Sequence, residues 1–270
     1  MTPKLPKPYY EQDGIVIFNA DCREILPYLP KVDLVLTDPP YGIGMDKAVT
    51  MPIHKNKFGK VRTSANYGFA DWDSQIPPKI VFDTMLKISK NQIIFGGNYF
   101  TEYLYPTNSW IFWDKKNNPQ NGKTFSDGEL IWTSLSFPMK KITYGWIGFD
   151  YINNPSKEVK QHPSQKPTPI IGILINLVDC DTILDPFMGS GTTLVAAKQL
   201  GRKAIGIEIE QRYCDIAIKR LSQGVLNLSI ESNSKVALNR EKPFPSLDDK
   251  NHTEPQGLID GEHRRDIENI

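Results

Sequence analysis

The sequence predicts an α/β domain built on a doubly wound, mostly parallel β-sheet. Short β-branched runs alternate with longer segments whose apolar residues recur at helical spacing. Two of the runs end in an aspartate that is followed at once by proline, and a glycine-rich turn joins the later one to a helical segment. Strands that alternate with helices in this way form parallel sheets with helices on both faces.

The strands are expected in β-branched and aromatic runs that end at Gly, Pro, Asn or Asp. In chain order they fall at residues 14–19, 32–37, 92–95, 110–113, 130–133, 182–184 and 204–209. Apolar residues at helical spacing predict the helices between and after them. In chain order these fall at residues 22–29, 80–88, 170–178, 192–200 and 211–221.

Two longer stretches, residues 42–75 and 135–161, interrupt this alternation. Both combine basic and aromatic residues, and loops of this length in a compact domain are usually functional or disordered. A solvated basic loop and a nucleic-acid surface are equally good interpretations of each stretch. The cations that would meet phosphates are Lys55, Lys57, Lys60, Arg62, Lys140 and Lys141.

Charge is distributed unevenly along the 270 residues, although the formal net charge is only +1. From Glu231 onward nine acidic side chains outnumber six basic ones, so the preceding part carries an excess of basic residues. The same C-terminal stretch has few aromatic residues, which favours a disordered or loosely packed tail. We therefore expect one folded domain at residues 1–225 and a tail at residues 226–270.

Composition argues against several classes of protein. No apolar run reaches the roughly 18 residues of a membrane helix, and the N-terminus lacks the layout of a secretory signal. We therefore expect a cytoplasmic protein with no membrane partner. Cys22, Cys180 and Cys214 lie far apart without a CxxC spacing, which supports neither a disulfide framework nor a metal site.

The loop after the strand at 32–37 carries Asp38, Pro39, Pro40 and Tyr41. Ligands bind at the carboxyl ends of strands in open α/β sheets, so this loop is expected in the binding site. The Asp38 carboxylate can accept hydrogen bonds from an exocyclic amino group, and a proline-locked backbone can aim the Pro39 carbonyl at the same nitrogen. Tyr41 offers a flat face to a base. A strand-end turn with a packed tyrosine is the structural alternative.

A glycine-rich loop follows the strand at 182–184. Its residues include Asp185, Phe187, Gly189, Ser190, Gly191, Thr192 and Thr193. Glycines allow a ligand close to the backbone. Leu194 stands where a dinucleotide fingerprint has its third glycine, and Gly191-Thr192 stands where a P-loop has Gly-Lys. The interpretation that remains is a nucleoside-type ligand that lies against the turn. Glu208, at the end of the next strand, is placed to accept hydrogen bonds from the ribose hydroxyls of such a ligand.

Together these motifs resemble the amino-group DNA methyltransferases that use S-adenosyl-L-methionine. The DPPY segment at 38–41 precedes the FMGSGTT segment at 187–193, which is the order of the permuted class called beta. Two further segments resemble family motifs: NADC at 19–22, whose Asp21 would meet the cofactor adenine, and HPSQKP at 162–167, which contains Lys166. The resemblance covers roughly residues 14–221.

The resemblance implies a Rossmann-like, circularly permuted fold with seven strands, one of them antiparallel. The strand that ends at Asp185 should lie beside the one that ends at Glu208. The cofactor would be held by the glycine-rich loop, Glu208, Asp21 and Lys166. For Asp21 an N-cap of the following helix is an equally good interpretation, and for Lys166 a surface lysine is the alternative.

The implied activity is site-specific methylation of adenine N6 in double-stranded DNA. Asp38 and the Pro39 carbonyl would stabilise the amino group as it becomes tetrahedral, after the base has flipped out and stacked on Tyr41. Cytosine N4 stays open as the target, because aspartate at position 38 favours adenine only loosely over the serine of many N4 enzymes. A third interpretation is a DNA-binding module that has lost catalysis, and the intact motifs argue against it. Cytosine carbon-5 chemistry is excluded, since it needs a Pro-Cys pair and the chain has none.

Recognition of the DNA sequence would fall to residues 135–161, with help from residues 42–75. Their shortness suggests a short target site. The sequence leaves two further partners open: a second copy of the chain in a homodimer, and a cognate restriction endonuclease.

Overall fold

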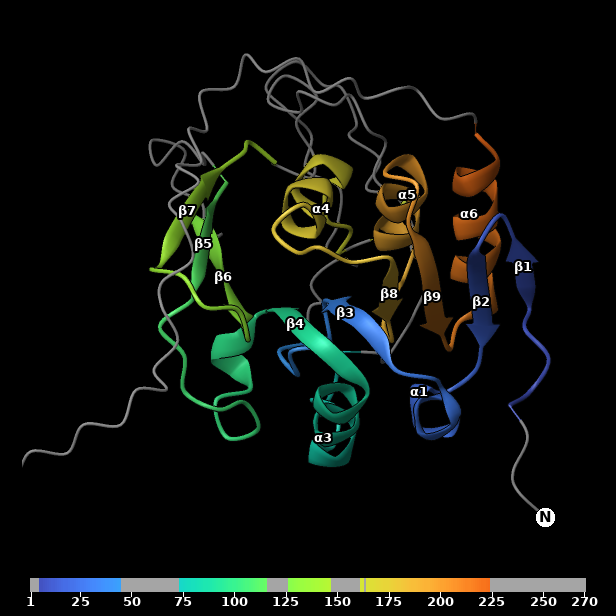
Figure 1. Cartoon of the computed structure of the whole chain (residues 1–270), viewed down its shortest axis with the longest axis horizontal. Helices are drawn as coiled ribbons and strands as arrows, with labels where there is room; N and C mark the ends of the chain where they lie inside the picture. Colours follow the sequence, from blue (N-terminus) through green and yellow to red (C-terminus); the bar gives the residue numbers. More distant parts are fainter. Residues whose placement is uncertain (1–4, 45–72, 116–125, 147–160, 163, 224–270) are drawn as a thin grey trace, which may run out of the picture. The chain divides into compact units, whose positions relative to one another are not determined.

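One twisted sheet runs through the part of the chain that the computed structural model describes, which is residues 5–44, 73–115, 126–146, 161–162 and 164–223 (Figure 1). Within these residues the sheet has nine strands in the order β1-β2-β9-β8-β3-β4-β6-β5-β7. They are β1 (Tyr10–Gln12), β2 (Ile15–Asn19), β3 (Val32–Thr37), β4 (Ser89–Phe95), β5 (Ile111–Asp114), β6 (Gly128–Thr133), β7 (Lys140–Thr143), β8 (Thr182–Asp185) and β9 (Lys203–Glu208).

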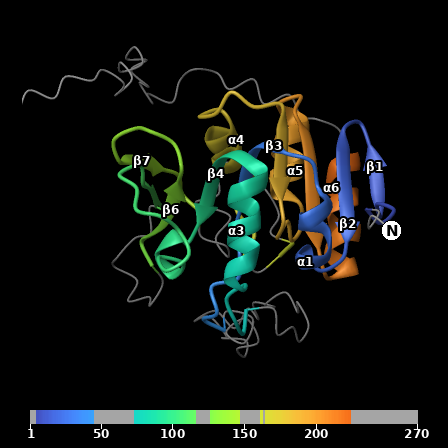
Figure 2. The ribbon, with the colours of Figure 1, turned by 60° about the horizontal axis from the view of Figure 1, so that its bottom comes forward.

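Helices cover both faces of the sheet, as Figures 1 and 2 show. One face packs against α4 (Thr168–Ile175), α5 (Thr192–Gln199) and α6 (Gln211–Ser222), and the other against α1 (Cys22–Ile25) and α3 (Lys79–Ile88). The 3-10 helices are η1 (Leu26–Tyr28) and η2 (Gly97–Tyr99). Successive side chains of a strand point to opposite faces, so Leu34 and Leu36 of β3 enter the first core and Val35 the second. The predicted doubly wound architecture is confirmed.

The central strands β2, β9, β8, β3 and β4 run parallel to one another. Their carboxyl ends meet at one edge of the sheet, where the loops after β3 and β8 begin. β8 and β9 come late in the chain but insert between β2 and β3. This confirms the expected pairing of the strands that end at Asp185 and Glu208.

The two ends of the sheet differ from the expected seven strands. β1 pairs antiparallel with β2 and β7 pairs with β5, which brings the described sheet to nine strands. Because β6 also runs against both of its neighbours, two described strands are antiparallel instead of one. β1 is short and largely exposed, and β7 begins with two lysines, so neither shows the apolar pattern from which strands are predicted. Short and charged strands are typical of sheet edges.

Local sequence accounts for the helix boundaries near the carboxyl edge of the sheet. The Asp21 side chain accepts the Arg23 N–H and caps α1. α5 begins directly after Gly191, whose φ of +77° is costly for any residue with a Cβ atom. The Asp21 cap and the left-handed conformation of Gly191 therefore set the residues at which α1 and α5 begin.

All described residues belong to one compact unit that spans Met1–Leu228. The expected tail at residues 226–270 and parts of the stretches 42–75 and 135–161 lie outside the described residues. In the portion of the chain that is described, no helix is long and apolar enough to cross a membrane.

Candidate active site

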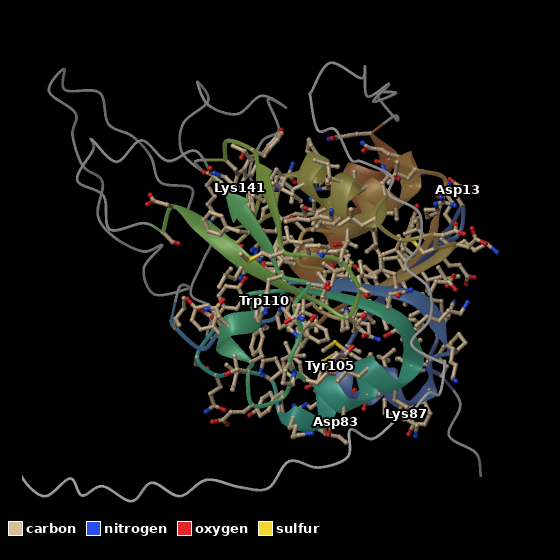
Figure 3. The ribbon with its side chains drawn as sticks, turned by 60° about the vertical axis from the view of Figure 1, so that its left-hand side comes forward. Asp13, Asp83, Lys87, Tyr105, Trp110 and Lys141 are labelled. Carbon is tan, nitrogen blue, oxygen red and sulfur yellow. The ribbon has the colours of Figure 1, made fainter. Side chains whose placement is uncertain are left out.

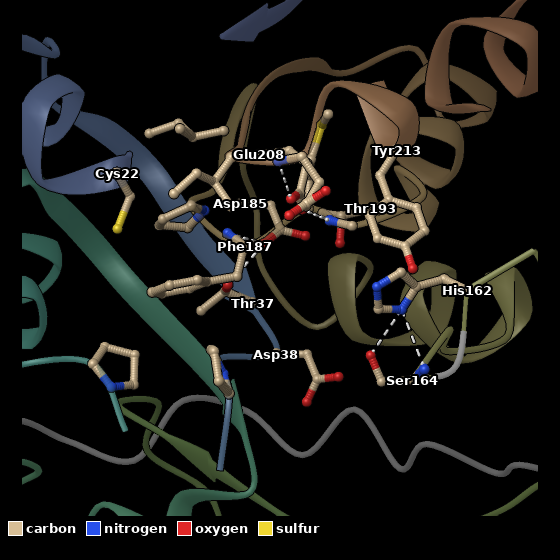
Figure 4. Close-up of a pocket in the computed structure, with 18 of the residues that line it drawn as sticks. Cys22, Thr37, Asp38, His162, Ser164, Asp185, Phe187, Thr193, Glu208 and Tyr213 are labelled. Atoms are coloured by element: carbon tan, nitrogen blue, oxygen red, sulfur yellow. Dashed lines mark hydrogen bonds between the residues drawn. The ribbon is translucent and has the colours of Figure 1, made fainter. Parts of the chain in front are cut away.

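A cavity of about 360 Å³ opens at the carboxyl ends of β3, β8 and β9 (Figure 4). Its size is that of a small-molecule site. The sequence-predicted residues that line it are Asp21, Asp38, Pro40, Lys166, Asp185, Phe187, Gly189, Ser190, Thr192, Thr193 and Glu208. Pro39, Tyr41 and Gly191 lie next to lining residues in the chain but do not line the cavity themselves. The tertiary structure thus brings both motif loops to one site.

The loop that carries Asp38 and Tyr41 is held by Asp73, a buried residue that sequence reasoning missed. Asp73 Oδ1 accepts the backbone N–H of Tyr41 at 2.7 Å and that of Gly42 at 3.0 Å. The Tyr41 hydroxyl in turn donates to Asp38 Oδ1 at 2.5 Å. These bonds fix both the backbone of the loop and the orientation of the Asp38 carboxylate.

The Tyr41 ring is packed within the protein on the β4 side of the loop. It stacks on Tyr99 with ring centroids 4.7 Å apart and an interplanar angle of 13°. A Cβ atom at Gly96 would lie 2.3 Å from the ring, so only glycine allows this approach. Stacking of Tyr41 on a flipped base stays a prediction, and Tyr99, which is 43% exposed, is a second aromatic surface beside it.

Four charged side chains of alternating sign form a row that begins at Asp38. Lys166 Nζ lies 2.5 Å from Asp38 Oδ2 and 3.3 Å from Glu129 Oε2. Glu129 Oε1 lies 2.5 Å from Lys115 Nζ. Lys166 therefore contacts the Asp38 carboxylate directly, although it was expected to bind the cofactor, and that expected role remains a prediction. Glu129 and Lys115 were missed, because no local pattern marks them.

Burial and charge act against each other in this row. Burial raises the pKa of Asp38 above its ordinary value, and the charge of Lys166 opposes that rise. Burial alone would lower the pKa of Lys166, but the charges of Asp38 and Glu129 raise it. Burial would likewise raise the pKa of Glu129, but Lys166 and Lys115 hold it below its ordinary value. Lys166 and Glu129 are therefore both charged at neutral pH.

The glycine-rich loop is anchored by Asp185 at the end of β8. Asp185 Oδ1 accepts the Thr37 hydroxyl at 2.7 Å and the Phe187 N–H at 3.2 Å, which ties this loop to the end of β3. Burial raises the pKa of Asp185 to about 6, although hydrogen bonds from Thr193 and Thr37 act in the opposite direction. A Cβ at Gly191 would lie 2.6 Å from the Ala217 Cβ, so this glycine lets the loop pack against α6.

Glu208 lies at the end of β9, on the cavity wall (Figure 4). Its Oε2 accepts the Gly189 N–H at 3.0 Å and its Oε1 accepts the Glu210 N–H at 2.8 Å. Burial raises the pKa of Glu208 to about 7. The carboxylate thus joins the glycine-rich loop to β9 and keeps further lone pairs for ligand hydroxyls.

Other residues at the cavity support its walls. Asp21 caps α1, forms an ion pair with Arg23 and also lines the cavity, so the N-cap interpretation is confirmed while cofactor contact stays a prediction. Arg220 of α6, which was not predicted, donates to the Ser190 carbonyl at 2.7 Å and to Thr192 Oγ1 at 3.0 Å. Arg220 shares a buried helix face with Ala217 and Leu221, and this spacing could have predicted that Arg220 is buried.

The basic residues that are predicted to contact DNA divide into two groups. Lys140 and Lys141 lie on the edge strand β7, and Figure 3 labels Lys141. Lys141 forms an ion pair with Asp114 at 2.8 Å. Neither lines the cavity. Lys55, Lys57, Lys60 and Arg62 lie outside the described residues.

The donor set of the cavity fits S-adenosyl-L-methionine. Glu208 would offer a carboxylate to ribose hydroxyls, and Phe187 would offer an aromatic face to the adenine (Figure 4). Asp21 lines the same cavity. Asp38 faces the cavity from β3, where an amino group that approaches the methyl donor would have to lie. The arrangement can bring a methyl donor and an amine together.

Comparisons with known proteins agree with this chemistry. A family model described as DNA methylase matches residues 76–219, just over half of the chain. Type II methyltransferase M2.LlaDCHI of Lactococcus lactis subsp. cremoris is 28% identical over 264 residues, which covers 82% of this chain and 94% of that protein. Type II methyltransferase M2.MboI of Moraxella bovis is 27% identical over 263 residues, which covers 85% and 96%. PvuII DNA methyltransferase (cytosine-N4-specific) has a TM-score of 0.51 and 19% identity and covers 79% of this chain and 88% of that one, a likeness of fold alone.

Proposed function

Because this chain belongs to the DNA methylase family that methylates N6 or N4 amino groups, we propose that it acts on N6 of adenine at a specific site in duplex DNA. The protein is a DNA methyltransferase of the amino type that uses S-adenosyl-L-methionine. The choice of adenine and the roles of single residues are the proposed part. Aspartate at position 38, where many N4 enzymes have serine, supports adenine.

The observation that carries this function is the environment of Asp38. Tyr41 and Lys166 each bind one of its carboxylate oxygens, which fixes the rotamer. Each oxygen has two lone pairs, so one acceptor site on each is left for the hydrogens of an amino group. The same carboxylate faces the cavity that the glycine-rich loop and Glu208 line. The target amine and the methyl donor can therefore meet there.

The lone pair of an exocyclic amine is delocalised into its ring, which makes the amine a poor nucleophile. Asp38 accepts hydrogen bonds from the amine most strongly as positive charge develops on the nitrogen, so it stabilises the transition state more than the ground state. The Pro39 carbonyl is assigned a second such bond. The bound cofactor supplies the methyl group on a sulfonium, and Glu208 with the glycine-rich loop orients the nucleoside that carries it. The amine is restored when a proton leaves for solvent.

Methylation of a plasmid by the full chain, followed by single-molecule sequencing, tests the proposal. We expect N6-methyladenine in one short sequence context and none with the Asp38→Ala variant. N4-methylcytosine would overturn the choice of base while leaving the family intact. Cofactor binding without methyl transfer to any DNA would instead make the chain a DNA-binding protein without catalysis.

The partners are part of the proposal. Lys55, Lys57, Lys60, Arg62, Lys140 and Lys141 are assigned to DNA phosphates. Relatives named Type II methyltransferases support a cognate restriction endonuclease that cuts the same sequence. Resistance of the methylated plasmid to an endonuclease of that specificity checks the partner. Sedimentation of the full chain checks whether it forms a homodimer.

A further inference from the structure

We propose that Glu129 is a positioning residue for methyl transfer. Because Glu129 also pairs with the Lys166 ammonium, Lys166 binds Asp38 less tightly, and the Asp38 carboxylate stays oriented and available to the target amine. The proposal rests on the role of Asp38 given above. Glu129 comes from β6, in the part of the sheet beyond β4 that carries none of the sequence motifs.

The geometry places Glu129 at the centre of the charged row. Its two oxygens face different cations: Oε1 lies 2.5 Å from Lys115 Nζ and Oε2 lies 3.3 Å from Lys166 Nζ. The pair of Glu129 and Lys115 spans neighbouring strands, since Lys115 directly follows β5 and β5 pairs with β6. Glu129 is thus held by the strand pair and by Lys115, and it is in a position to direct Lys166.

The Lys166 ammonium contacts both carboxylates, that of Asp38 and that of Glu129. Its side chain is 9% exposed, and its ammonium lies 5.1 Å from the centroid of the Phe95 ring and 5.8 Å from that of Tyr41. An ammonium so removed from water needs paired anions, and the 2.5 Å contact with Asp38 is shorter than the 3.3 Å contact with Glu129. Without Glu129, the ammonium would pair with Asp38 alone and compete with the target amine for its oxygens.

The charges around Asp38 determine how each substitution changes its titration. The groups concerned are Lys166, Tyr41, Glu129 and, across the cavity, Asp185. The negative charge of Glu129 raises the pKa of Asp38, after the larger effects of burial and Lys166. Glu129→Gln removes that charge with little change of shape, so the pKa of Asp38 should fall.

The test is the pH profile of the single-turnover methylation rate, which reports chemistry and not product release. If Asp38 must be ionised, the acid limb of the profile should move to lower pH in Glu129→Gln. At neutral pH the rate should fall by up to about a hundredfold, since a displacement of about 1 Å at a reacting group can cost that much. Affinity for S-adenosyl-L-methionine should stay within about threefold, a difference below 1 kcal/mol, because Glu129 does not line the cavity.

Lys115→Met provides a second variant that should act in the opposite direction. This variant removes one of the two ammonium groups that Glu129 contacts. Glu129 should then draw the Lys166 ammonium away from Asp38, so the acid limb should move to higher pH. Asp33→Asn is the matched control. Asp33 also joins neighbouring strands through a lysine, since it lies 2.6 Å from Lys90 and accepts the Thr182 hydroxyl, but it does not line the cavity. Its loss should reduce stability without moving the acid limb.

The outcomes separate this proposal from the proposed function. If Asp38→Ala still methylates adenine, the role proposed for Asp38 fails, and that of Glu129 fails with it, while the choice of adenine stands. If Asp38→Ala is inactive but folded Glu129→Gln keeps the acid limb of the wild type, only the role of Glu129 is wrong. Should Glu129→Gln not fold, Lys115→Met decides, because an acid limb that is unchanged or moves to lower pH contradicts the proposal. Opposite displacements in the two variants, with Asp33→Asn unmoved, would support it.

Discussion

Replacement of Glu208 by glutamine should weaken cofactor binding and, at the same time, change how the stability of the protein depends on pH. The Glu208 carboxylate accepts two backbone N–H groups and is assigned to the ribose hydroxyls of the cofactor. Hydrogen bonds to a charged group contribute about 1.5–3 kcal/mol, so the dissociation constant of S-adenosyl-L-methionine should rise by roughly ten- to hundredfold. The methylation rate at saturating cofactor should change little.

The effect on stability follows from burial. The pKa of Glu208 is raised from 4.5 to about 7 in the folded protein, so the folded state holds this proton more tightly than the unfolded state. Its contribution to stability is therefore complete below pH 4.5 and is lost as the pH rises through about 7. At about 1.4 kcal/mol for each pH unit between these values, the loss amounts to about 3 kcal/mol, most of it between pH 5 and pH 8.

Glutamine does not titrate, and it offers one acceptor oxygen instead of two. One backbone N–H is left without its partner, which costs about 1–3 kcal/mol at every pH. The free energy of unfolding of the wild type, minus that of Glu208→Gln, should therefore be largest near pH 5 and smaller by about 2–3 kcal/mol at pH 8. The change with pH isolates the titration from the constant loss of the hydrogen bond.

Urea unfolding without cofactor, followed from pH 5 to pH 8, measures this difference, and calorimetric titration measures cofactor affinity. Glu210→Gln is the matched control, since it removes a carboxylate two residues away whose side chain is 45% exposed. A stability difference that does not change with pH would refute the reasoning about burial. An unchanged affinity for S-adenosyl-L-methionine would refute the assignment of Glu208 to the cofactor.

Three further predictions concern the loop that carries Asp38 and Tyr41 and the basic residues that are proposed to contact DNA. Asp38→Ala should abolish methyl transfer while cofactor affinity stays within about tenfold, because its carboxylate is assigned to the target amine; cofactor titration would contradict this if affinity fell by several orders of magnitude. Gly96→Ala should destabilise the protein by about 1–3 kcal/mol, since φ is +64° and the added Cβ would meet the Tyr41 ring, whereas Gly172→Ala, where nothing lies within 4 Å, should not. Equal urea midpoints for these two variants would disprove it. Replacement of four basic residues by alanine should flatten the slope of log affinity against log salt by up to about 3.6 on any duplex, and an unchanged slope would make their stretch a solvated loop. These residues are Lys55, Lys57, Lys60 and Arg62.

The sequence by itself determined the class of fold and the location of the two motif loops. The reason is that both depend on local information. Alternating apolar patterns predict strands and helices, and the carboxyl ends of parallel strands meet at one edge wherever the strands lie in the chain. Asp38, Asp185 and Glu208 each end or directly follow a strand of that kind, so their approach to a common cavity could be expected without coordinates. The edge strands β1 and β7 lack an apolar pattern, so they could not be predicted from the sequence.

Only the tertiary structure decided which side chains surround Asp38. Lys166 was recognised by its motif, yet its contact with Asp38 joins residues 128 positions apart. Glu129 lies on β6 and Lys115 directly follows β5, and the pairing of these two strands has no local signature. Asp73 reaches the Tyr41 backbone from a loop. Whether a carboxylate meets an ammonium, a backbone N–H or water depends on the register of strands and the packing of loops. Because the strength of those interactions grows as water is excluded, burial in the folded chain sets the charge and orientation of Asp38 and Lys166.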